Sequence, residues 1–292
     1  EDTVRLIEEI AGTGNLQLVM EPIEFEITCT YGGKTVELDR FSGFVERTVA
    51  LPDNVDPAKV TTAVVLNGDG TFSHVPTRIV EMNGSYYAVI SSLTNSTYSI
   101  IWNTMEFSDV AGHWARELVT DMGKRLVIGG VGEGLFAPDR DISRAEFAAI
   151  MVRALGLKPE TADNPFNDVP ETAWYGDCIK AAYQYGIVSG DKGGWYRPMD
   201  TITREQAMTI IARSMKLVGL DVQPGNDETE KILSQFRDKN DISAYAKTGI
   251  AACIKAGIVS GRDAGFIAPR DSITRAEAAT IIQRLLQKTN LI

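Results

Sequence analysis

The sequence is poor in the residues that bind metals and form disulfides. It has three cysteines and two histidines among 292 residues. Cys29, Cys178 and Cys253 form no CxxC pair, and an odd number of cysteines cannot all be joined in disulfides. Because neither histidine lies near a cysteine, too few ligands remain for a zinc site. We therefore expect no metal and no cofactor, and expect Cys178 and Cys253 to be buried apolar residues of helices.

A long apolar segment and an excess of positive charge are also missing. No run of about 18 apolar residues occurs, so the sequence predicts no membrane-spanning helix. The net charge is −10, which argues against nucleic acid as a partner, because its binding proteins carry a basic surface. The chain starts at Glu1 without an initiator Met or a signal peptide. We expect a processed product or a fragment, from the C-terminal end of a longer surface protein.

The first hundred residues alternate apolar and polar side chains, as half-buried strands do. Turn-forming pairs such as Asn83-Gly84 separate several of these segments. Asn67-Gly68-Asp69-Gly70 could also hold calcium, but it has too few carboxylates for such a loop, so we favour a hairpin turn. Short strands at this spacing predict an antiparallel β-sandwich-like domain over residues 1–104, of unknown role. The expected strands cover about 23–29, 35–38, 44–49, 61–66, 86–90 and 98–102.

From Met105 onward, one unit is written three times, which predicts a repeat architecture. Each copy opens with Phe-x-Asp, followed by an aromatic residue, an apolar pair, a glycine and, eight residues after that glycine, a proline. We place the repeats at 105–158, 159–221 and 222–292, with an insertion at about 219–235. The glycines, which we expect to permit a tight turn, and the prolines are Gly130, Gly190, Gly261, Pro138, Pro198 and Pro269.

Two helices are expected in each repeat. Together with the strands expected before residue 105, they predict a multidomain α+β protein. The second helices carry wide apolar stripes and must pack against similar partners. Three copies therefore imply an all-α part with a central three-helix bundle and pseudo-threefold symmetry. Gly186 and Gly257 are expected to end the first helices in a left-handed conformation, whereas repeat one has Leu126 there and must end its helix another way. The expected helices are 114–125, 143–155, 174–185, 203–218, 244–256 and 274–287.

Each second helix is preceded by a capping box. A Ser or Thr side chain accepts a hydrogen bond from the backbone N–H three residues later, and a Glu or Gln at that position reaches back. These residues are thereby explained by helix architecture, at about 1 kcal/mol for each cap. The three pairs are Ser143 with Glu146, Thr203 with Gln206, and Thr274 with Glu277.

An arginine follows each capping residue, at the first position of the helix. A cation beside the positive end of a helix dipole is mildly destabilising, so three copies of this choice favour a function. An arginine together with free backbone N–H groups would bind an anion, above all a planar carboxylate. The alternative is a solvated residue or an ion-pair partner for a repeated Asp of the Phe-x-Asp start. On the functional interpretation, replacing this arginine by Ala in repeat three would leave stability nearly unchanged. The arginines are Arg144, Arg204 and Arg275.

The combined pattern resembles the S-layer homology (SLH) repeat. Trp114-Ala115, Phe136-Ala137-Pro138 and Ser143-Arg144-Ala145-Glu146 carry the resemblance in repeat one, and Ile258 to Gly261 with Thr274 to Glu277 carry it in repeat three. The resemblance implies a three-pronged spindle that anchors a surface protein non-covalently to the cell wall of Gram-positive bacteria. The implied ligand is an anionic secondary cell-wall polymer, commonly with a pyruvate-ketal sugar, held in grooves between repeats. It also implies an extracellular location in the S-layer, with other S-layer subunits as further partners.

Three groups of ligand-binding residues follow from the resemblance: the motif arginines, an aromatic wall and a glycine-containing loop. Repeat two departs from the family pattern by reading Thr203-Arg204-Glu205-Gln206, and repeat three has a tyrosine in the aromatic wall, so the grooves need not bind equally. With two aspartates of the Phe-x-Asp starts added, the candidates are Arg144, Arg204, Arg275, Trp114, Trp174, Tyr245, Asp109, Asp168, Gly129, Gly130, Ser189, Gly190, Ser260 and Gly261. Without the family, the aromatic residues would be interpreted mostly as core anchors.

Two rival functions remain open. A cell-wall glycosidase would need two carboxylates in a cleft, but Glu146 and Glu277 are used as caps, and no nucleophile-elbow motif accompanies His74 or His113. The sequence thus predicts no catalytic residues and no enzyme. A protein-only S-layer assembly module would need no carbohydrate site, but it gives no reason to repeat an arginine at the start of three helices.

Overall fold

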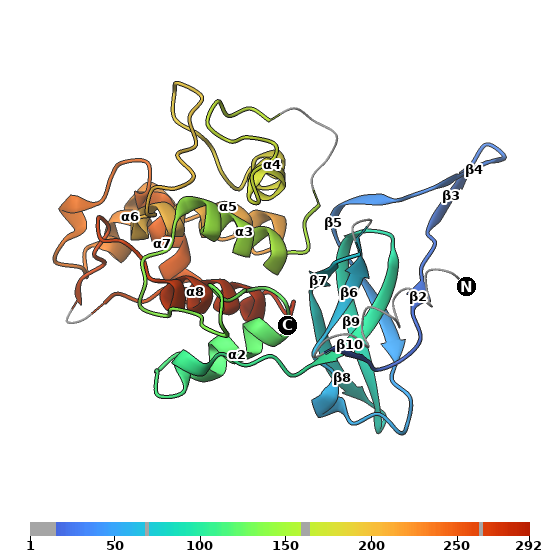
Figure 1. The fold of residues 1–292 in the computed structure, drawn as a ribbon. Coiled ribbons are helices and arrows are strands. Elements are labelled where there is room, and N and C mark those ends of the chain that lie inside the picture. The colour runs from blue at the N-terminus through green and yellow to red at the C-terminus, as the bar shows by residue number, and fades with distance from the viewer. Residues whose placement is uncertain (1–15, 68–69, 159–163, 263–264) are drawn as a thin grey trace.

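The computed structural model describes residues 16–67, 70–158, 164–262 and 265–292. Figure 1 shows strands gathered on one side and helices on the other, so the expected mixed α+β content is confirmed. Within the described residues, the strands all precede the α-helices along the chain. One short 3₁₀ turn, Pro57–Lys59, lies among the strands, and another, Ser108–Val110, lies between the last strand and the first described α-helix. A third 3₁₀ turn, Lys239–Asp241, lies in the helical part.

The strands of the N-terminal part form two larger antiparallel sheets. One has the order β1-β10-β6-β7, with β2 also paired to β10, and the other has the order β5-β9-β8. Both sheets contribute to one buried cluster, with Val65 and Ile100 from the first and Val49 and Ile90 from the second. The strands are β1 (Leu16–Leu18), β2 (Ile23–Glu24), β5 (Arg40–Ala50), β6 (Thr62–Leu66), β7 (Phe72–Val75), β8 (Thr77–Met82), β9 (Ser85–Thr94) and β10 (Thr97–Asn103).

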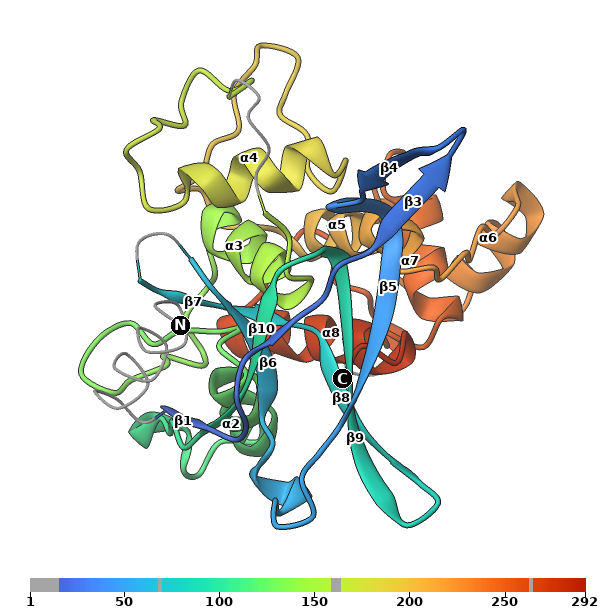
Figure 2. The same cartoon turned by 90° about the vertical axis from the view of Figure 1, so that its right-hand side faces the viewer.

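Two predicted turns have the backbone that their residues favour. Asn83 and Gly84 both take positive φ, 54° and 81°, as a two-residue hairpin turn requires, and they join β8 to β9. Gly32 and Gly33 likewise join β3 (Thr28–Tyr31) to β4 (Lys34–Glu37), an exposed hairpin that projects from the sheets in Figures 1 and 2. Residues 68–69 of the other turn lie outside the described residues, so the choice between hairpin and calcium loop stays a prediction.

Each repeat has the two helices that the pattern predicts, and the insertion adds a short one. The first helix of a repeat packs on the second helix of the repeat before it: α4 on α3, α7 on α5 and, closing the circle, α2 on α8. α8 also contacts α3 and α5. The helices are α2 (Arg116–Lys124), α3 (Arg144–Ala154), α4 (Gly176–Gln184), α5 (Arg204–Leu217), α6 (Asn226–Leu233), α7 (Lys247–Lys255) and α8 (Arg275–Lys288).

Backbone hydrogen bonds join the three repeats in a ring just before the second helices. The N–H of Ile142 donates to Ile273 O at 3.0 Å, that of Ile273 to Ile202 O at 3.2 Å, and that of Ile202 to Ile142 O at 3.1 Å. All three isoleucines are buried. Each repeat thus gives one bond and receives one, which brings the starts of α3, α5 and α8 together.

The two parts of the protein are joined by specific contacts. β7 lies against α3, Asn103 Nδ2 donates to Lys124 O at 2.8 Å, and Arg125 Nη1 donates to Thr77 O at 3.1 Å. His74 of β7 is 2% exposed. Burial first, and then the positive charge of Arg125, lower its pKa to about 3, so this histidine is neutral at the junction.

The first helices end as glycine caps predict, with one correction. Gly186 and Gly257 have φ of 69°, the left-handed conformation of a helix C-cap. Repeat one was expected to end differently, which is wrong: Leu126 takes the same conformation, with φ of 63°. A left-handed residue other than glycine costs about 1–2 kcal/mol, which the contacts of repeat one must offset.

The repeated glycine eight residues before each proline has a different role from the tight turn expected of it. Gly130, Gly190 and Gly261 have no positive φ. Instead, a Cβ at Gly261 would lie 2.7 Å from Phe266 O and 2.8 Å from the Phe236 ring. Equivalent contacts surround the other two copies. These positions therefore need glycine because the phenylalanine of the Phe-x-Asp start packs directly on the backbone.

Candidate ligand-binding grooves

The start of each second helix is fully used inside the protein. All three capping boxes are present, which confirms their prediction. The N–H groups of Arg144 and Ala145 donate to Asp200 O and Pro198 O at 2.9 Å, in the neighbouring repeat. The other two copies bond in the same way. The expected free backbone N–H groups are therefore absent from these helix starts, so the first N–H groups of these helices offer no donor to an anion.

The repeated aspartates organise the loop before each proline. Asp109 accepts hydrogen bonds from Phe136 N at 2.8 Å and Ala137 N at 2.6 Å, and Asp168 binds the Tyr196 and Arg197 N–H groups likewise. Burial opposes ionisation of Asp109, but these N–H groups together outweigh it and hold its pKa below the usual range. Both carboxylate oxygens are thus occupied within the repeat, and a ligand contact by Asp109 or Asp168 stays a prediction.

The motif arginines each reach across a repeat boundary. Arg144 Nε donates to Tyr196 O at 2.8 Å, Arg204 Nε to Ile267 O at 2.9 Å, and Arg275 Nε to Phe136 O at 2.8 Å. Each arginine therefore extends into the next repeat in cyclic order, repeat three into repeat one. The expected alternative, an ion pair with the repeated Asp, is wrong, because the carboxylates that these arginines meet belong to capping glutamates.

Two of the arginines are paired with the capping glutamate of the repeat they enter. Arg275 Nη1 donates to Glu146 Oε1 at 2.9 Å and its Nη2 donates to Gly129 O at 2.8 Å. Arg204 Nη1 lies 3.3 Å from Glu277 Oε1. Arg204 is 6% exposed and Arg275 4%. The interpretation of these two arginines as purely functional is therefore wrong, because both also form ion pairs, with partly buried glutamates, that join repeats.

Arg144 differs from its two counterparts. The cap that it faces is Gln206, so no glutamate carboxylate is available there. Its guanidinium stacks on the Tyr196 ring, with 4.7 Å between the guanidinium carbon and the ring centroid. Among the described residues, its terminal nitrogens have no hydrogen-bond or ion-pair partner. Arg144 is thus the motif arginine for which no described residue pairs with either terminal nitrogen.

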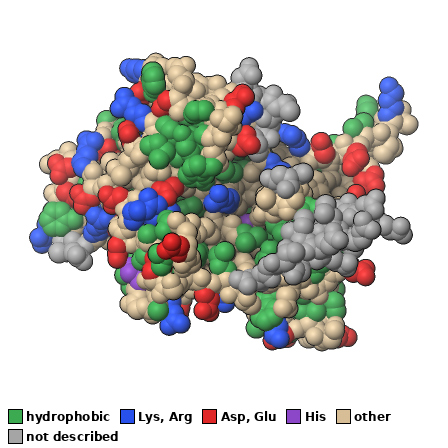
Figure 3. Space-filling view, in the orientation of Figure 1, with side chains coloured by type: hydrophobic (Ala, Val, Ile, Leu, Met, Phe, Trp, Pro, Cys, Tyr) green, Lys and Arg blue, Asp and Glu red, His purple; other side chains and the backbone are tan. Residues whose placement is uncertain are grey.

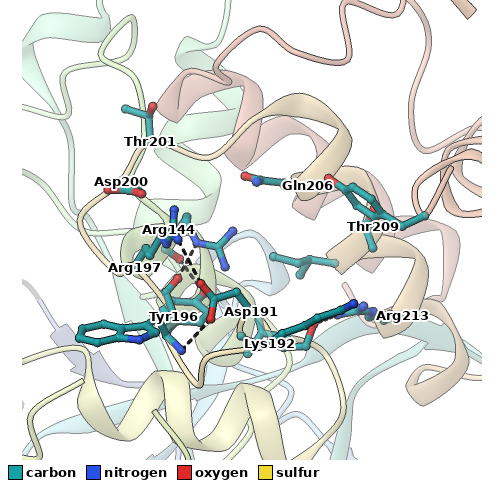
Figure 4. Close-up of a pocket in the computed structure, with 16 residues that line it drawn as sticks. Arg144, Asp191, Lys192, Tyr196, Arg197, Asp200, Thr201, Gln206, Thr209 and Arg213 are labelled. Carbon is teal, nitrogen blue, oxygen red and sulfur yellow. Dashed lines mark hydrogen bonds and ion pairs between the residues drawn. The ribbon is translucent and has the colours of Figure 1, made fainter. Parts of the chain in front are cut away.

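Two hollows hold equivalent residues at neighbouring repeat boundaries. The first, of about 710 Å³, is shown in Figure 4 and includes Arg144, Ser189, Gly190 and Tyr245. The second, of about 630 Å³, includes Arg275, Gly129, Gly130 and Trp174. The structure thus brings motif arginine, glycine loop and aromatic residue together from three repeats in each. Ser260 and Gly261 line a different hollow, of about 460 Å³, whose lining does not include Arg204.

The aromatic residues of the predicted wall lie on the surface. Trp114 is 66% exposed, Trp174 59% and Tyr245 58%. Their interpretation as core anchors is wrong, since the repeated phenylalanines fill that role. Exposed aromatic faces beside charged side chains suit contact with a sugar ring. Figure 3 likewise shows hydrophobic side chains beside lysine and arginine on the helical part.

Several residues of the first groove were missed by the sequence analysis. Trp195, 50% exposed, and Arg213 both line it. Glu205 was noted only as a departure from the family pattern. It is 2% exposed and accepts hydrogen bonds from Ser243 N at 2.9 Å and Tyr245 Oη at 3.0 Å. The carboxylate of Glu205, at the second position of α5, thus holds Tyr245 of the aromatic wall in its orientation.

The remaining predictions concern cysteines, metals and membrane segments. Cys253 is buried as expected, and burial raises its pKa to about 12, but Cys178 is only partly buried. Within the described ranges, no group of three or more His, Cys, Asp or Glu side chains could hold a metal ion. No described helix is long and apolar enough to cross a membrane.

Comparison with known proteins assigns the repeats. A family model described as S-layer homology domain matches residues 106–148, 165–208 and 235–279. The chain belongs to the S-layer homology family. Its SLH domains coincide with the three arginine-containing units, and such domains in surface-layer and cell-wall proteins indicate anchoring at the cell wall and an extracellular location.

The relatives of this SLH chain include both enzymes and surface-layer proteins. An exoglucanase of Acetivibrio thermocellus is 33% identical over 68% of this chain and 18% of that protein. An amylopullulanase of Thermoanaerobacterium thermosulfurigenes is 31% identical over 84% of this chain and 13% of that protein. A surface-layer 125 kDa protein of Lysinibacillus sphaericus is 34% identical over 49% of this chain and 11% of that protein. The chain therefore spans less than a fifth of the length of these relatives.

Proposed function

We propose that this chain anchors a surface protein to the bacterial cell wall by binding an anionic secondary cell-wall polymer in the grooves between its SLH repeats. The observation that carries the proposal is the convergence of a motif arginine, a glycine loop and an exposed aromatic residue from three repeats. An arginine offers a carboxylate two parallel donors, and an aromatic face packs against a sugar ring. A polymer that carries pyruvate-ketal sugars supplies both groups.

The finer architecture belongs to the same proposal. Residues 105–158, 159–221 and 222–292 would be the three prongs of a spindle around a central helix bundle. Residues 1–104 would form a β-sandwich that acts as a spacer or assembly segment, since they contain none of the repeated motif. The ring of backbone bonds at Ile142, Ile202 and Ile273 supports the threefold arrangement.

The rival functions have less support. For a glycosidase, Glu146 and Glu277 are unsuitable, because each is held by its cap and by arginines; enzymatic activity would then belong to other parts of longer relatives. For a protein-only assembly module, the exposed aromatic residues beside arginines have no assigned use. We therefore propose that the chain itself is not an enzyme.

Pull-down with purified cell-wall sacculi tests the proposal. The intact chain should sediment with native sacculi and remain in solution with sacculi whose secondary polymer has been removed by acid extraction. The chain should also sediment with inert beads that have been coated with the extracted polymer. Equal sedimentation with native and extracted sacculi would instead show that the polymer is not the ligand.

A further inference from the structure

We propose that the three repeat boundaries are chemically unequal, and that the Arg144 groove is the principal site for a sugar-borne carboxylate because Gln206 replaces a glutamate there. The inference rests on the proposed function and adds which groove takes the acidic group. It also gives the Glu or Gln of the capping box a second role. In two repeats this residue is a glutamate that pairs with a motif arginine from another repeat, and in repeat two it is Gln206, which leaves Arg144 without an ion-pair partner among the described residues.

At the other two motif arginines, Arg204 and Arg275, the protein supplies its own anion. Glu146 receives hydrogen bonds from Arg275 and from Arg140, and Glu277 receives them from Arg204 and Arg262. A ligand carboxylate at either arginine would have to displace a partly buried glutamate or lie beside it. Two carboxylates at the same arginine would lie close together and repel each other. Binding there must therefore overcome an existing ion pair before it gains a new one.

In the Arg144 groove the same cap is made without a negative charge. Gln206 Oε1 accepts the Thr203 N–H at 3.1 Å, which leaves the Nε2 amino group as a donor. The equivalent glutamates place an oxygen 2.9 Å and 3.3 Å from an arginine Nη1. Figure 4 shows the Gln206 amide directed toward the side of the groove that holds Arg144. Two sets of N–H donors thus face one region, and none of the described residues pairs with the terminal nitrogens of Arg144 there.

The surroundings of this groove suit a sugar. Its volume of about 710 Å³ is in the range of small-molecule sites. Tyr245 forms one wall, and its hydroxyl is fixed by Glu205, so the ring is held in place before a ligand arrives. Lys192 and Arg213 also line the groove. Such a fixed ring reduces the ordering cost of binding.

Total charge does not distinguish the grooves. Four basic and two acidic side chains line the Arg144 groove, and three basic and one acidic side chain line the Arg275 groove, the same excess of positive charge. The acid nearest the glycine loop, Asp191, is held by Arg197 at 3.1 Å and by the N–H groups of Gly193 and Trp195. The distinction therefore comes from which arginine is already paired.

The ligand class is a hexose that carries a carboxylate. A pyruvate ketal and a uronic acid both present this group: a uronic acid carries it directly on the sugar ring, and a 4,6-pyruvate ketal carries it on the ketal carbon, farther from that ring. Titration calorimetry with the whole chain would use three monovalent probes: a methyl hexoside with a 4,6-pyruvate ketal, methyl glucuronoside and neutral methyl hexoside. Wild-type protein should bind at least one acidic probe with a stoichiometry near one and should not bind the neutral one. Whichever acidic probe binds identifies the source of the carboxylate.

Exchanging glutamine and glutamate gives the decisive variants, because both residues form the capping box. Gln206→Glu should lower affinity for the acidic probe by about ten- to a hundredfold, the range of one charge-assisted contact. Glu146→Gln should open a second site and raise the stoichiometry toward two. Gln287→Glu, an exposed change on α8 with the same change in net charge, should have no effect. Circular dichroism would show that each variant is folded.

The outcomes separate this inference from the function on which it rests. Unchanged affinity in folded Gln206→Glu, a wild-type stoichiometry of two or three, or no binding of either acidic probe would each overturn it. Polymer-dependent sedimentation with sacculi would in those cases still support anchoring. Equal sedimentation with native and acid-extracted sacculi would overturn the anchoring function itself.

Discussion

Replacing Arg275 by Ala should destabilise the protein far more than replacing Arg144, although both hold the same place in their repeats. Arg275 donates hydrogen bonds to Phe136 O, Glu146 and Gly129 O at 2.8–2.9 Å and is 4% exposed. Its guanidinium also lies 4.6 Å from the centroid of the Phe136 ring. Arg144 keeps one such hydrogen bond and the ring contact.

The size of the destabilisation depends on which interactions Glu146 keeps when the Arg275 side chain is removed. Removing one partner of a buried ion pair costs about 3–5 kcal/mol, but Glu146 would retain Arg140 and the Ser143 N–H. We therefore expect Arg275→Ala to lower the free energy of unfolding by about 3 kcal/mol, against about 1 kcal/mol for Arg144→Ala, a hydrogen bond without an ion pair. At roughly 2–4 °C for each kcal/mol, the melting temperatures should fall by roughly 6–12 °C and 2–4 °C.

Thermal and urea unfolding, followed by circular dichroism at 222 nm, would measure both variants beside wild-type protein. Arg204→Ala is the matched control and should behave like Arg275→Ala, because Arg204 is also paired and buried. Equal stability of Arg275→Ala and wild type, or a greater loss for Arg144→Ala, would refute the assignment of Arg275 as a structural ion-pair residue.

Further predictions concern the caps, the packed glycines and acid stability. Thr274→Ala should lower the free energy of unfolding by about 0.5–2 kcal/mol in urea titrations, while Thr274→Ser should not. Gly261→Ala should cost at least about 1 kcal/mol in the same assay, because its Cβ would lie 2.7 Å from Phe266 O. Burial opposes ionisation of Glu146 and Glu277, but cap N–H groups and arginines outweigh it and lower both pKa values from 4.5. The stability contributed by a carboxyl with a lowered pKa is present above pH 4.5 and is lost as pH falls through the folded-state pKa. The melting temperature should therefore decline below pH 4.5, less steeply in Glu146→Gln, and an equal decline in both proteins would contradict this role.

The helical part was predictable because its signals are local and are written three times. A capping box, an apolar stripe and a following glycine depend on neighbours within a few residues, so Thr203 and Gly186 could be interpreted without the fold. The strands were less predictable from the sequence. β7 and β8 were not predicted, since Thr77–Met82 mixes polar and apolar residues without strict alternation and is stabilised by pairing with β9.

The partners of the motif arginines could not be predicted, because they come from another repeat. Arg275 and Glu146 are 129 residues apart, and a helix start examined alone shows only free N–H groups. The carbonyls of Pro138 and Arg140 that use those N–H groups also come from another repeat. The exchange of glutamate for Gln206 was visible in the sequence, but its consequence for Arg144 depends on knowing which arginine faces which cap.

The cyclic bonding of Ile142, Ile202 and Ile273 bears on how such a chain can change in evolution. An open stack of repeats can be lengthened by duplication, because each added unit meets the last one as the last met its predecessor. A closed circle has no free end at which a fourth unit could attach. Deleting one unit would also leave an unmatched donor and an unmatched acceptor at its centre. Growth of this protein is therefore confined to loops such as the one that carries α6, and to segments outside the circle.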